Sequence, residues 1–294
     1  MTPPLLNILE ENWQTSFNKT LQESALDCLE QGQVIYFPQL TFYLNEQETH
    51  LLQPQLTHSN AKNISFDALQ NRLQGISKVS AADKNTVIQL LARYHAYTQS
   101  LITHLVPDYE SHLTSGRTSL RTLEAQGRRT SPKKDDNRLH IDAFPSLPMG
   151  NRRILRVFSN INPDDKPRIW YLGESFAQVA QRFLPLIKPP LPGSRWLLHY
   201  LHITKRYRTA YDHYMLGIHD HMKLDEYYQQ QVPKFEIQFP AGSTWIVFTD
   251  VTSHAAISGQ YLLEQTFYLP YTAMRQPTLS PQAILKQQQP LALT

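Results

Sequence analysis

Hydrophobic residues recur along the chain at two different spacings, and each spacing dominates one part of it. Over residues 5–31, apolar side chains follow one another at three and four positions, the repeat of one helix face, and the pattern stops at Gly32. Residues 46–105 show the same repeat. Between them, residues 34–38 form a short apolar segment closed by a proline, which predicts a strand. The part of the chain up to about residue 115 is therefore expected to be mainly helical.

From about residue 116 to residue 272, short apolar segments alternate with turns, which is typical of strands. We expect strands at residues 118–125, 154–161 and 170–172, after Gly242, and at residues 260–269. A segment rich in His and Tyr, residues 193–232, interrupts them and is expected to form one or two helices. The chain closes with a Gln- and Pro-rich tail, residues 275–294, which is expected to be loosely ordered.

This arrangement predicts an α+β protein with a single domain over residues 1–294. Helices and strands do not alternate regularly and no Gly-rich phosphate loop is visible, so a doubly wound parallel sheet is not expected. We expect instead a double-stranded β-helix, the cupin-like jelly roll, with flanking N-terminal helices and an inserted helical segment.

Composition narrows the function classes. With 41% hydrophobic and 18% charged residues, the chain has the composition of an ordinary globular protein. Its net charge of +3 is too small to indicate a nucleic-acid partner. The single Cys28 excludes an internal disulfide and a cysteine-based zinc site, and it fits a reducing compartment. No secretory signal pattern and no apolar run near ~18 residues is visible, so a cytoplasmic protein is expected.

The strongest candidate chemistry lies in residues 138–145, Arg-Leu-His-Ile-Asp-Ala-Phe-Pro. In an extended segment alternate side chains share one face, so His140 and Asp142 are expected to point the same way. One imidazole and one carboxylate at this spacing make up two thirds of the two-His, one-carboxylate site of non-haem iron(II) oxygenases. His254, which follows an apolar segment and a loop, is the candidate for the third ligand.

Further histidines lie in the predicted helical insertion. His219 and His221 flank Asp220, while His199 and His202 are three residues apart, as on one helical face. We expect a polar surface or a substrate wall there rather than a second metal site. His219 and His221 are the alternative ligands if His254 does not serve.

Four stretches closely resemble the Kdo hydroxylase family, and together they span roughly residues 115–270. They are residues 135–145, 153–163 and 168–176 and the region from His254 to residue 267. Members of this family are iron(II)- and 2-oxoglutarate-dependent enzymes that act on 3-deoxy-D-manno-octulosonic acid (Kdo). The resemblance implies that His140, Asp142 and His254 bind Fe(II), and that 2-oxoglutarate and O2 are cosubstrates.

The same resemblance implies the reaction, which is hydroxylation of the deoxy carbon C3 of Kdo in Kdo-lipid A to give the sugar called Ko. Two alternatives could use the same three ligands. One is a peptide hydroxylase of the prolyl type, and the other is a metal-binding cupin without oxygenase activity.

The cosubstrate carboxylate requires a cation. Many related oxygenases carry an Arg or Lys about eleven residues after the distal His, but here that position is Gln265. Arg156 is the better candidate, because a charge inside an apolar strand is costly unless an anion meets it. We place Asn160 of the same strand and Gln265 beside it in the predicted cosubstrate site.

Two basic clusters could bind the anionic groups of Kdo-lipid A. The first precedes the His-Asp motif and the second lies in the insertion; their members are Arg128, Arg129, Lys133, Lys134 and Arg138, and Lys205, Arg206 and Arg208. Because Trp196 and Tyr200 lie close to the second cluster in sequence, we expect peripheral contact with the cytoplasmic face of an inner membrane.

Overall fold

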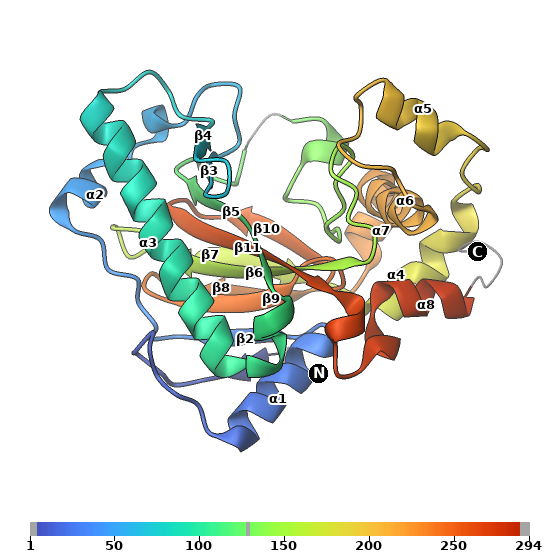
Figure 1. Ribbon diagram of the computed structural model, residues 1–294, viewed down its shortest axis with the longest axis horizontal. Helices are drawn as coiled ribbons and strands as arrows, with labels where there is room; N and C mark the ends of the chain where they lie inside the picture. Colours follow the sequence, from blue (N-terminus) through green and yellow to red (C-terminus); the bar gives the residue numbers. More distant parts are fainter. Residues whose placement is uncertain (1–4, 128–129, 289–294) are drawn as a thin grey trace.

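Two β-sheets organise the structure, a computed structural model that describes residues 5–127 and 130–288 (Figure 1). The larger sheet has the strand order β1-β2-β9-β6-β11-β5-β3-β4. Its strands are β1 (Leu5–Asn7), β2 (Val34–Phe37), β9 (Thr244–Phe248), β6 (Arg152–Asn160), β11 (Leu262–Pro270), β5 (Thr114–Arg121), β3 (Ile64–Asp67) and β4 (Arg72–Gln74). The smaller sheet has the order β10-β7-β8, with β10 (His254–Ser258), β7 (Arg168–Leu172) and β8 (Phe235–Phe239).

The two sheets face each other across an aromatic core. Phe158 of β6 and Trp245 of β9 come from the larger sheet, and Trp170 and Phe239 come from the smaller one. The rings of Phe239 and Trp245 stack with centroids 4.0 Å apart, and those of Phe158 and Trp170 meet edge to face at 5.1 Å. Within both sheets the pairing is antiparallel except between β1 and β2. Two antiparallel sheets closed over a shared core confirm the predicted jelly roll.

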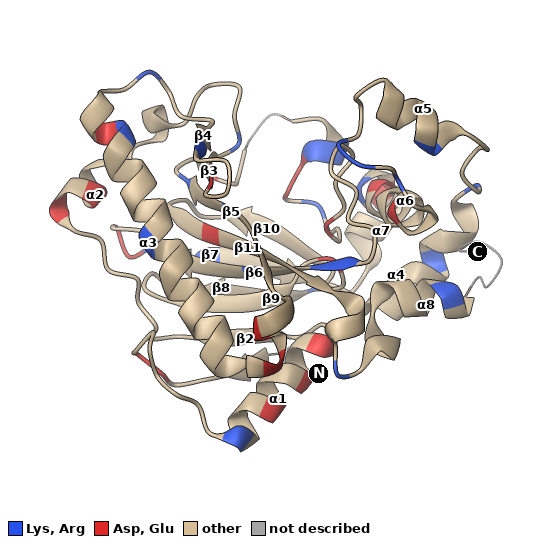
Figure 2. Ribbon diagram, viewed as in Figure 1, with Lys and Arg blue, Asp and Glu red and all other residues tan. Residues whose placement is uncertain are grey.

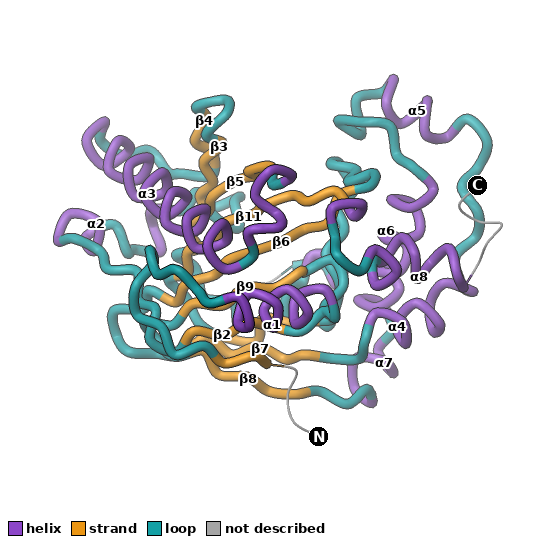
Figure 3. Tube along the Cα trace, turned by 60° about the horizontal axis from the view of Figure 1, so that its bottom comes forward, coloured by secondary structure: helices purple, strands orange, loops and turns teal. Residues whose placement is uncertain are grey.

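Helices cover the outer face of the larger sheet (Figure 3). They are α1 (Lys19–Glu30), the short α2 (Glu46–His50) and α3 (Ala81–Leu105). Tyr94 of α3 is fully buried, and its hydroxyl lies 3.1 Å from Ser159 Oγ of β6. This contact joins the helical layer to the strand that crosses the middle of the sheet.

The predicted helical N-terminal part is wrong in two places. Residues 5–31 do not form one helix, because residues 5–7 pair with β2 and the helix begins only after Asn18, whose side chain accepts a hydrogen bond from the Leu21 amide. Residues 46–105 include β3 and β4, which pair with β5 and with each other. These strands are three and four residues long, too short for an alternating pattern to outweigh the helical repeat around them.

A second group of helices lies at one end of the sheets (Figure 1). Its members are α4 (Phe176–Phe183), α5 (Ser194–Tyr200), α6 (Ala210–Leu224), α7 (Glu226–Gln231) and α8 (Pro281–Gln288). The inserted segment therefore holds three helices, α5 to α7, where one or two were predicted. The tail prediction is wrong for residues 281–288, because α8 packs on α4 and buries Leu285 to 1% exposure.

His199 and His202 do not share a helical face. Helix α5 ends at Tyr200, and His202 has a left-handed backbone with φ 55°. The three-residue spacing therefore does not bring the two imidazoles together at one ligand site.

Candidate active site

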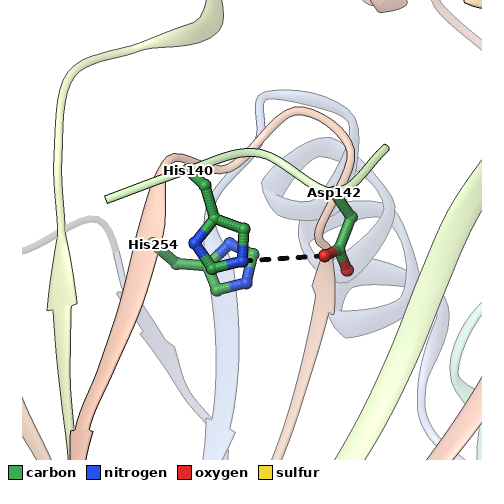
Figure 4. A group of neighbouring side chains, drawn as sticks. All are labelled: His140, Asp142 and His254. Atoms are coloured by element: carbon green, nitrogen blue, oxygen red, sulfur yellow. Dashed lines mark ion pairs between the residues drawn. The ribbon is translucent and has the colours of Figure 1, made fainter. Parts of the chain in front are cut away.

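The His-Asp segment joins the fold beside the start of β10. His140 and His254 form an isolated antiparallel bridge, in which each backbone amide donates to the other's carbonyl at 3.0 and 2.9 Å. The Asp142 amide donates to the carbonyl of Thr249 at 2.8 Å. These bonds hold residues 140–142 extended without a regular strand, so both side chains turn into the space between the sheets (Figure 4).

One ligand atom from each of His140, Asp142 and His254 lies within 4.8 Å of the others (Figure 4). His140 Nε2 is 3.8 Å from Asp142 Oδ1. Nδ1 of each histidine lies 2.8 Å from a backbone carbonyl, that of Arg138 for His140 and that of Thr252 for His254. A carbonyl can only accept, so each Nδ1 carries the hydrogen and each Nε2 presents its lone pair.

The electrostatics keep these side chains in the protonation states that ligate metals. Burial lowers the pKa of both imidazoles, most strongly that of His140. Burial alone would raise the pKa of Asp142, but the Arg156 guanidinium outweighs it and holds that pKa well below its usual range. Two neutral imidazoles and one carboxylate, brought together at the wall of a cavity, suit a divalent iron ion with coordination positions left open.

Buried charges continue from Asp142 away from this centre. Arg156 Nη2 lies 3.0 Å from Asp142 Oδ2, and Arg156 Nη1 lies 2.5 Å from Glu264 Oε1 of β11. Glu264 also pairs with Arg121 of β5 at 2.5 Å. The premise that Arg156 is a lone charge is therefore wrong, because two carboxylates, those of Asp142 and Glu264, already meet it. Sequence reasoning missed Glu264, and only strand register brings it to Arg156.

A cavity of about 650 Å³ opens beside the three candidate ligands. Arg121, Arg156 and Arg168 line its inner part, around the buried charge network. Arg117, Arg152, Lys205 and Arg206 line its outer part. Figure 2 colours the Lys and Arg positions blue along the ribbon, and blue recurs on the segment that joins α5 and α6. The cavity is thus suited to anionic ligands.

Arg168 of β7 is a further site residue that the sequence analysis did not single out. Its side chain is buried, Nη1 donates to the Gly259 carbonyl, and Nε has no hydrogen-bond partner. Within the part of the chain that the structure describes, no carboxylate forms an ion pair with it. Burial, and secondarily the charge of Arg121, lowers the pKa of Arg168 to about 10. The sequence did carry a signal for it. Arg168, Trp170 and Leu172 alternate along one short strand, which places the charged side chain on the same buried face as two apolar ones.

Trp170 lies between Arg168 and the candidate ligands. Its ring stacks on that of His254 at 5.0 Å, and its indole nitrogen is buried without a partner. A buried polar group normally has a partner, so this N–H and the Arg168 Nε, like the Arg156 Nε, have unused hydrogen-bonding capacity beside the inner cavity.

Asn160 and Gln265 do not line the cavity. The Asn160 amide donates to the carbonyls of Lys166 and Phe239, which ties strand ends together. Gln265 points to the opposite face of β11 from Glu264, where it accepts a hydrogen bond from Thr118. Its predicted place in the cosubstrate site is therefore wrong, since alternation along the strand turns it toward the helical layer.

The described members of the first basic cluster, Lys133, Lys134 and Arg138, also lie off the cavity. Arg128 and Arg129 lie outside the described residues. Lys133 pairs with Asp220, and Arg138 pairs with Glu226, both at 2.5 Å. Lys134 is exposed.

The second cluster lies closer, since Lys205 and Arg206 line the cavity mouth and Arg208 donates to the Pro145 carbonyl.

The two alternative histidines lie outside the ligand group. His219 packs against His140 with ring centroids 5.7 Å apart but pairs with Asp220, and His221 stacks on Phe183. Neither histidine joins the candidate ligand group.

Comparison with known proteins agrees with this site. The family model described as 3-deoxy-D-manno-oct-2-ulosonic acid (Kdo) hydroxylase matches residues 12–290. A solved Kdo hydroxylase, described as a non-heme Fe(II) alphaketoglutarate-dependent dioxygenase in complex with cobalt(II), is 47% identical, with 97% of this chain and 95% of that chain covered and a TM-score of 0.94. The same enzyme type in complex with alphaketoglutarate and Fe(III) is 45% identical, with 100% and 98% covered and a TM-score of 0.95.

No curated protein matches the chain. The family match nevertheless spans nearly the whole sequence, and the solved structures agree with it in fold over nearly their full length. The chain belongs to the Kdo hydroxylase family, and it is a 2-oxoglutarate-dependent dioxygenase of the jelly-roll type.

Proposed function

We propose that this enzyme hydroxylates C3 of Kdo in Kdo-lipid A and so produces Ko. The observation that carries the proposal is the meeting of His140, Asp142 and His254 at the wall of a cation-lined cavity. With iron(II) bound there, 2-oxoglutarate and O2 would supply the oxidation that turns a C–H bond into C–OH, while 2-oxoglutarate leaves as succinate and CO2.

The roles of the protein side chains follow from their contacts. His140 and His254 would bind the ion through Nε2, because a backbone carbonyl occupies each Nδ1–H. Asp142 would bind through one carboxylate oxygen, with Arg156 fixing the other at 3.0 Å. Arg156 thus acts at the metal end of the cavity as a positioning residue.

Arg168 is the residue that we assign to the distal carboxylate of 2-oxoglutarate. Trp170 stacks on the ligand His254, and Arg168 lies two residues from Trp170 on the same face of β7, in the same cavity. The other inner guanidiniums already have carboxylate partners, whereas Arg168 has none among the residues described.

We also propose that the α5 corner of the molecule rests on the cytoplasmic face of an inner membrane. Exposed apolar side chains concentrate there; they include Leu191, Trp196, Leu197, Tyr200, Leu201 and Ile203. Arg195, Lys205, Arg206 and Arg208 lie in the same stretch, which contains no acidic residue between positions 175 and 211. None of the helices described is long and apolar enough to cross a bilayer, so this contact would be peripheral.

The decisive experiment incubates the purified protein with iron(II), 2-oxoglutarate, O2 and Kdo-lipid A. We expect the lipid to gain the mass of one oxygen atom, with succinate released in equal amount. Omitting 2-oxoglutarate is the control and should abolish both signals. Succinate release without any mass gain on a Kdo-containing lipid would overturn the assigned substrate.

A further inference from the structure

The outer end of the cavity holds a cluster of cations that the proposed chemistry does not use. Arg117 of β5, Arg152 of β6 and Arg206 after α5 line it together with Tyr268 of β11. The Arg152 guanidinium lies 4.8 Å from the centre of the Tyr268 ring. Burial, and then the charge of Arg206, lowers the pKa of Arg152, which places these two cations near each other.

These cations lack the carboxylate partners that the inner cations have. Over residues 5–127 and 130–288, none of Arg117, Arg152 and Arg206 forms an ion pair with an acidic side chain. Asp212 is the acidic side chain whose charge acts on Arg152. Its oxygens already accept hydrogen bonds from the backbone amides of Met149, Gly150 and Thr209. Neighbouring like charges without a counter-ion are costly, so an anion from a ligand would stabilise this end.

The Tyr268 ring, which lies beside these cations, packs closely against β5. Gly116 of β5 lies against Tyr268, and a Cβ at that position would fall 2.9 Å from Tyr268 Cε2. The missing side chain at Gly116 leaves room for the Tyr268 ring. Arg152 lies over that ring, which favours one position of its guanidinium for contact with a carboxylate or phosphate.

Distance separates this cluster from the reaction centre. Arg152 and Arg156 point to the same side of β6 and are four residues apart, which corresponds to about 13 Å along the strand. Arg156 contacts the candidate ligand Asp142. In Kdo the carboxylate carbon is two bonds from C3, only about 2.5 Å. We therefore assign an anion bound at Arg152 to a group other than the carboxylate of the sugar that is being hydroxylated.

We propose that Arg117, Arg152 and Arg206 form a second anion subsite, which binds an acidic group on the unit next to the reacting sugar. This inference rests on the proposed function and specifies its substrate. The group is a carboxylate or a phosphate, since both match the guanidinium fork. The enzyme would then select substrates in which a linked unit carries a second negative charge, and a single sugar would bind poorly.

The test compares Arg152→Gln and the double variant Arg117→Gln/Arg152→Gln with Arg72→Gln, the same chemical change at an exposed position of β4 outside the cavity. Three substrates are used: a simple glycoside of one Kdo, a Kdo disaccharide, and Kdo-lipid A with its phosphates. For Arg152→Gln we expect the KM to rise about 10- to 100-fold on a substrate with the second anion and to stay unchanged on the single-sugar glycoside. The kcat should change little, and Arg152→Lys should recover part of the loss.

The pattern of losses identifies the anion. A loss on the disaccharide assigns the subsite to a sugar carboxylate, and a loss on the phosphorylated lipid alone assigns it to a phosphate. Calorimetric binding of the disaccharide to the cobalt(II) enzyme without O2 should show the same ratio independently of turnover. Equal KM values for wild type and both variants on all three substrates would overturn the subsite, whereas a wild type inactive on every Kdo substrate would overturn the proposed function instead.

Discussion

The inner and outer ends of one cavity carry similar numbers of cations. The two groups differ in whether carboxylates of the protein pair with them. At the inner end, Arg156 and Arg121 share Glu264, and Arg156 also reaches Asp142. At the outer end, Arg117 and Arg152 meet no carboxylate among the residues described. Cations paired within the fold hold protein groups in place, and cations without partners are available to a ligand.

Arg168 is the exception that sharpens this contrast. It lies at the inner end, yet it forms no ion pair with any acidic residue that the structure describes. By the same logic it belongs functionally with the ligand-binding cations, and the inner cavity holds both a paired charge network and one cation without an acidic partner among the described residues.

The largest effect is expected at the candidate ligands between the two ends. His140→Ala, Asp142→Ala or His254→Ala should each abolish hydroxylation, because an incomplete set of ligands does not hold catalytic iron. Succinate release measures activity, and the melting temperature of the histidine variants should stay near that of the wild type, since the site lines a cavity. Full activity of His254→Ala would redirect attention to His219 and His221.

Arg156→Met should damage both stability and metal binding. It leaves the buried Asp142 without its guanidinium, so we expect unfolding to become easier by about 3 kcal/mol, the low end for a broken buried pair because Glu264 keeps Arg121. Cobalt(II) affinity should fall about 10- to 100-fold as Asp142 loses its orientation. Denaturant titration and metal titration measure the two effects, and unchanged values in both would show that the network does not position Asp142.

Arg168→Met tests whether the cation without an acidic partner has a different role from the paired cations. We expect the KM for 2-oxoglutarate to rise about 10- to 100-fold, since a charge-assisted contact to a carboxylate is lost. Stability should not fall, because the variant removes a buried charge that has no partner. If Arg156→Met raised this KM and Arg168→Met did not, the distal carboxylate would belong to Arg156.

The smallest effect is expected at the cavity mouth and the α5 corner. Changing Lys205, Arg206 and Arg208 to Ser should reduce flotation with liposomes containing Kdo-lipid A about tenfold or less, because each exposed cation adds at most ~1 kcal/mol and salt screens it. Changing Lys133, Lys134 and Lys166 to Ser removes the same charge elsewhere on the surface and should leave flotation unchanged. Equal flotation of both triple variants would remove the second cluster from membrane contact.

Much of the fold and the candidate ligand set could be predicted from the chain alone. Alternating apolar segments between turns indicated antiparallel strands, and β6, β7, β9 and β11 lie close to their expected positions, whereas β8 and β10 were not predicted. His140 and Asp142 share one face because their segment is extended, a consequence of two-residue periodicity that needs no tertiary information. The short β3 and β4 were missed because a local pattern of three or four residues is weaker than the helical repeat around it.

Charge pairing was decided only by the tertiary structure. Arg156, Arg152 and Arg168 look alike in sequence, as cations in or beside apolar strands. Strand register places Thr266 opposite Arg156, so the neighbouring Glu264 reaches its guanidinium, while Arg168 meets no acid within the described chain. Coulomb energy depends on distances between residues that are about a hundred positions apart, and no local pattern encodes those distances. The sequence by itself thus determined the family, the jelly roll and the candidate ligands, and the tertiary structure decided which cations remain free for substrates.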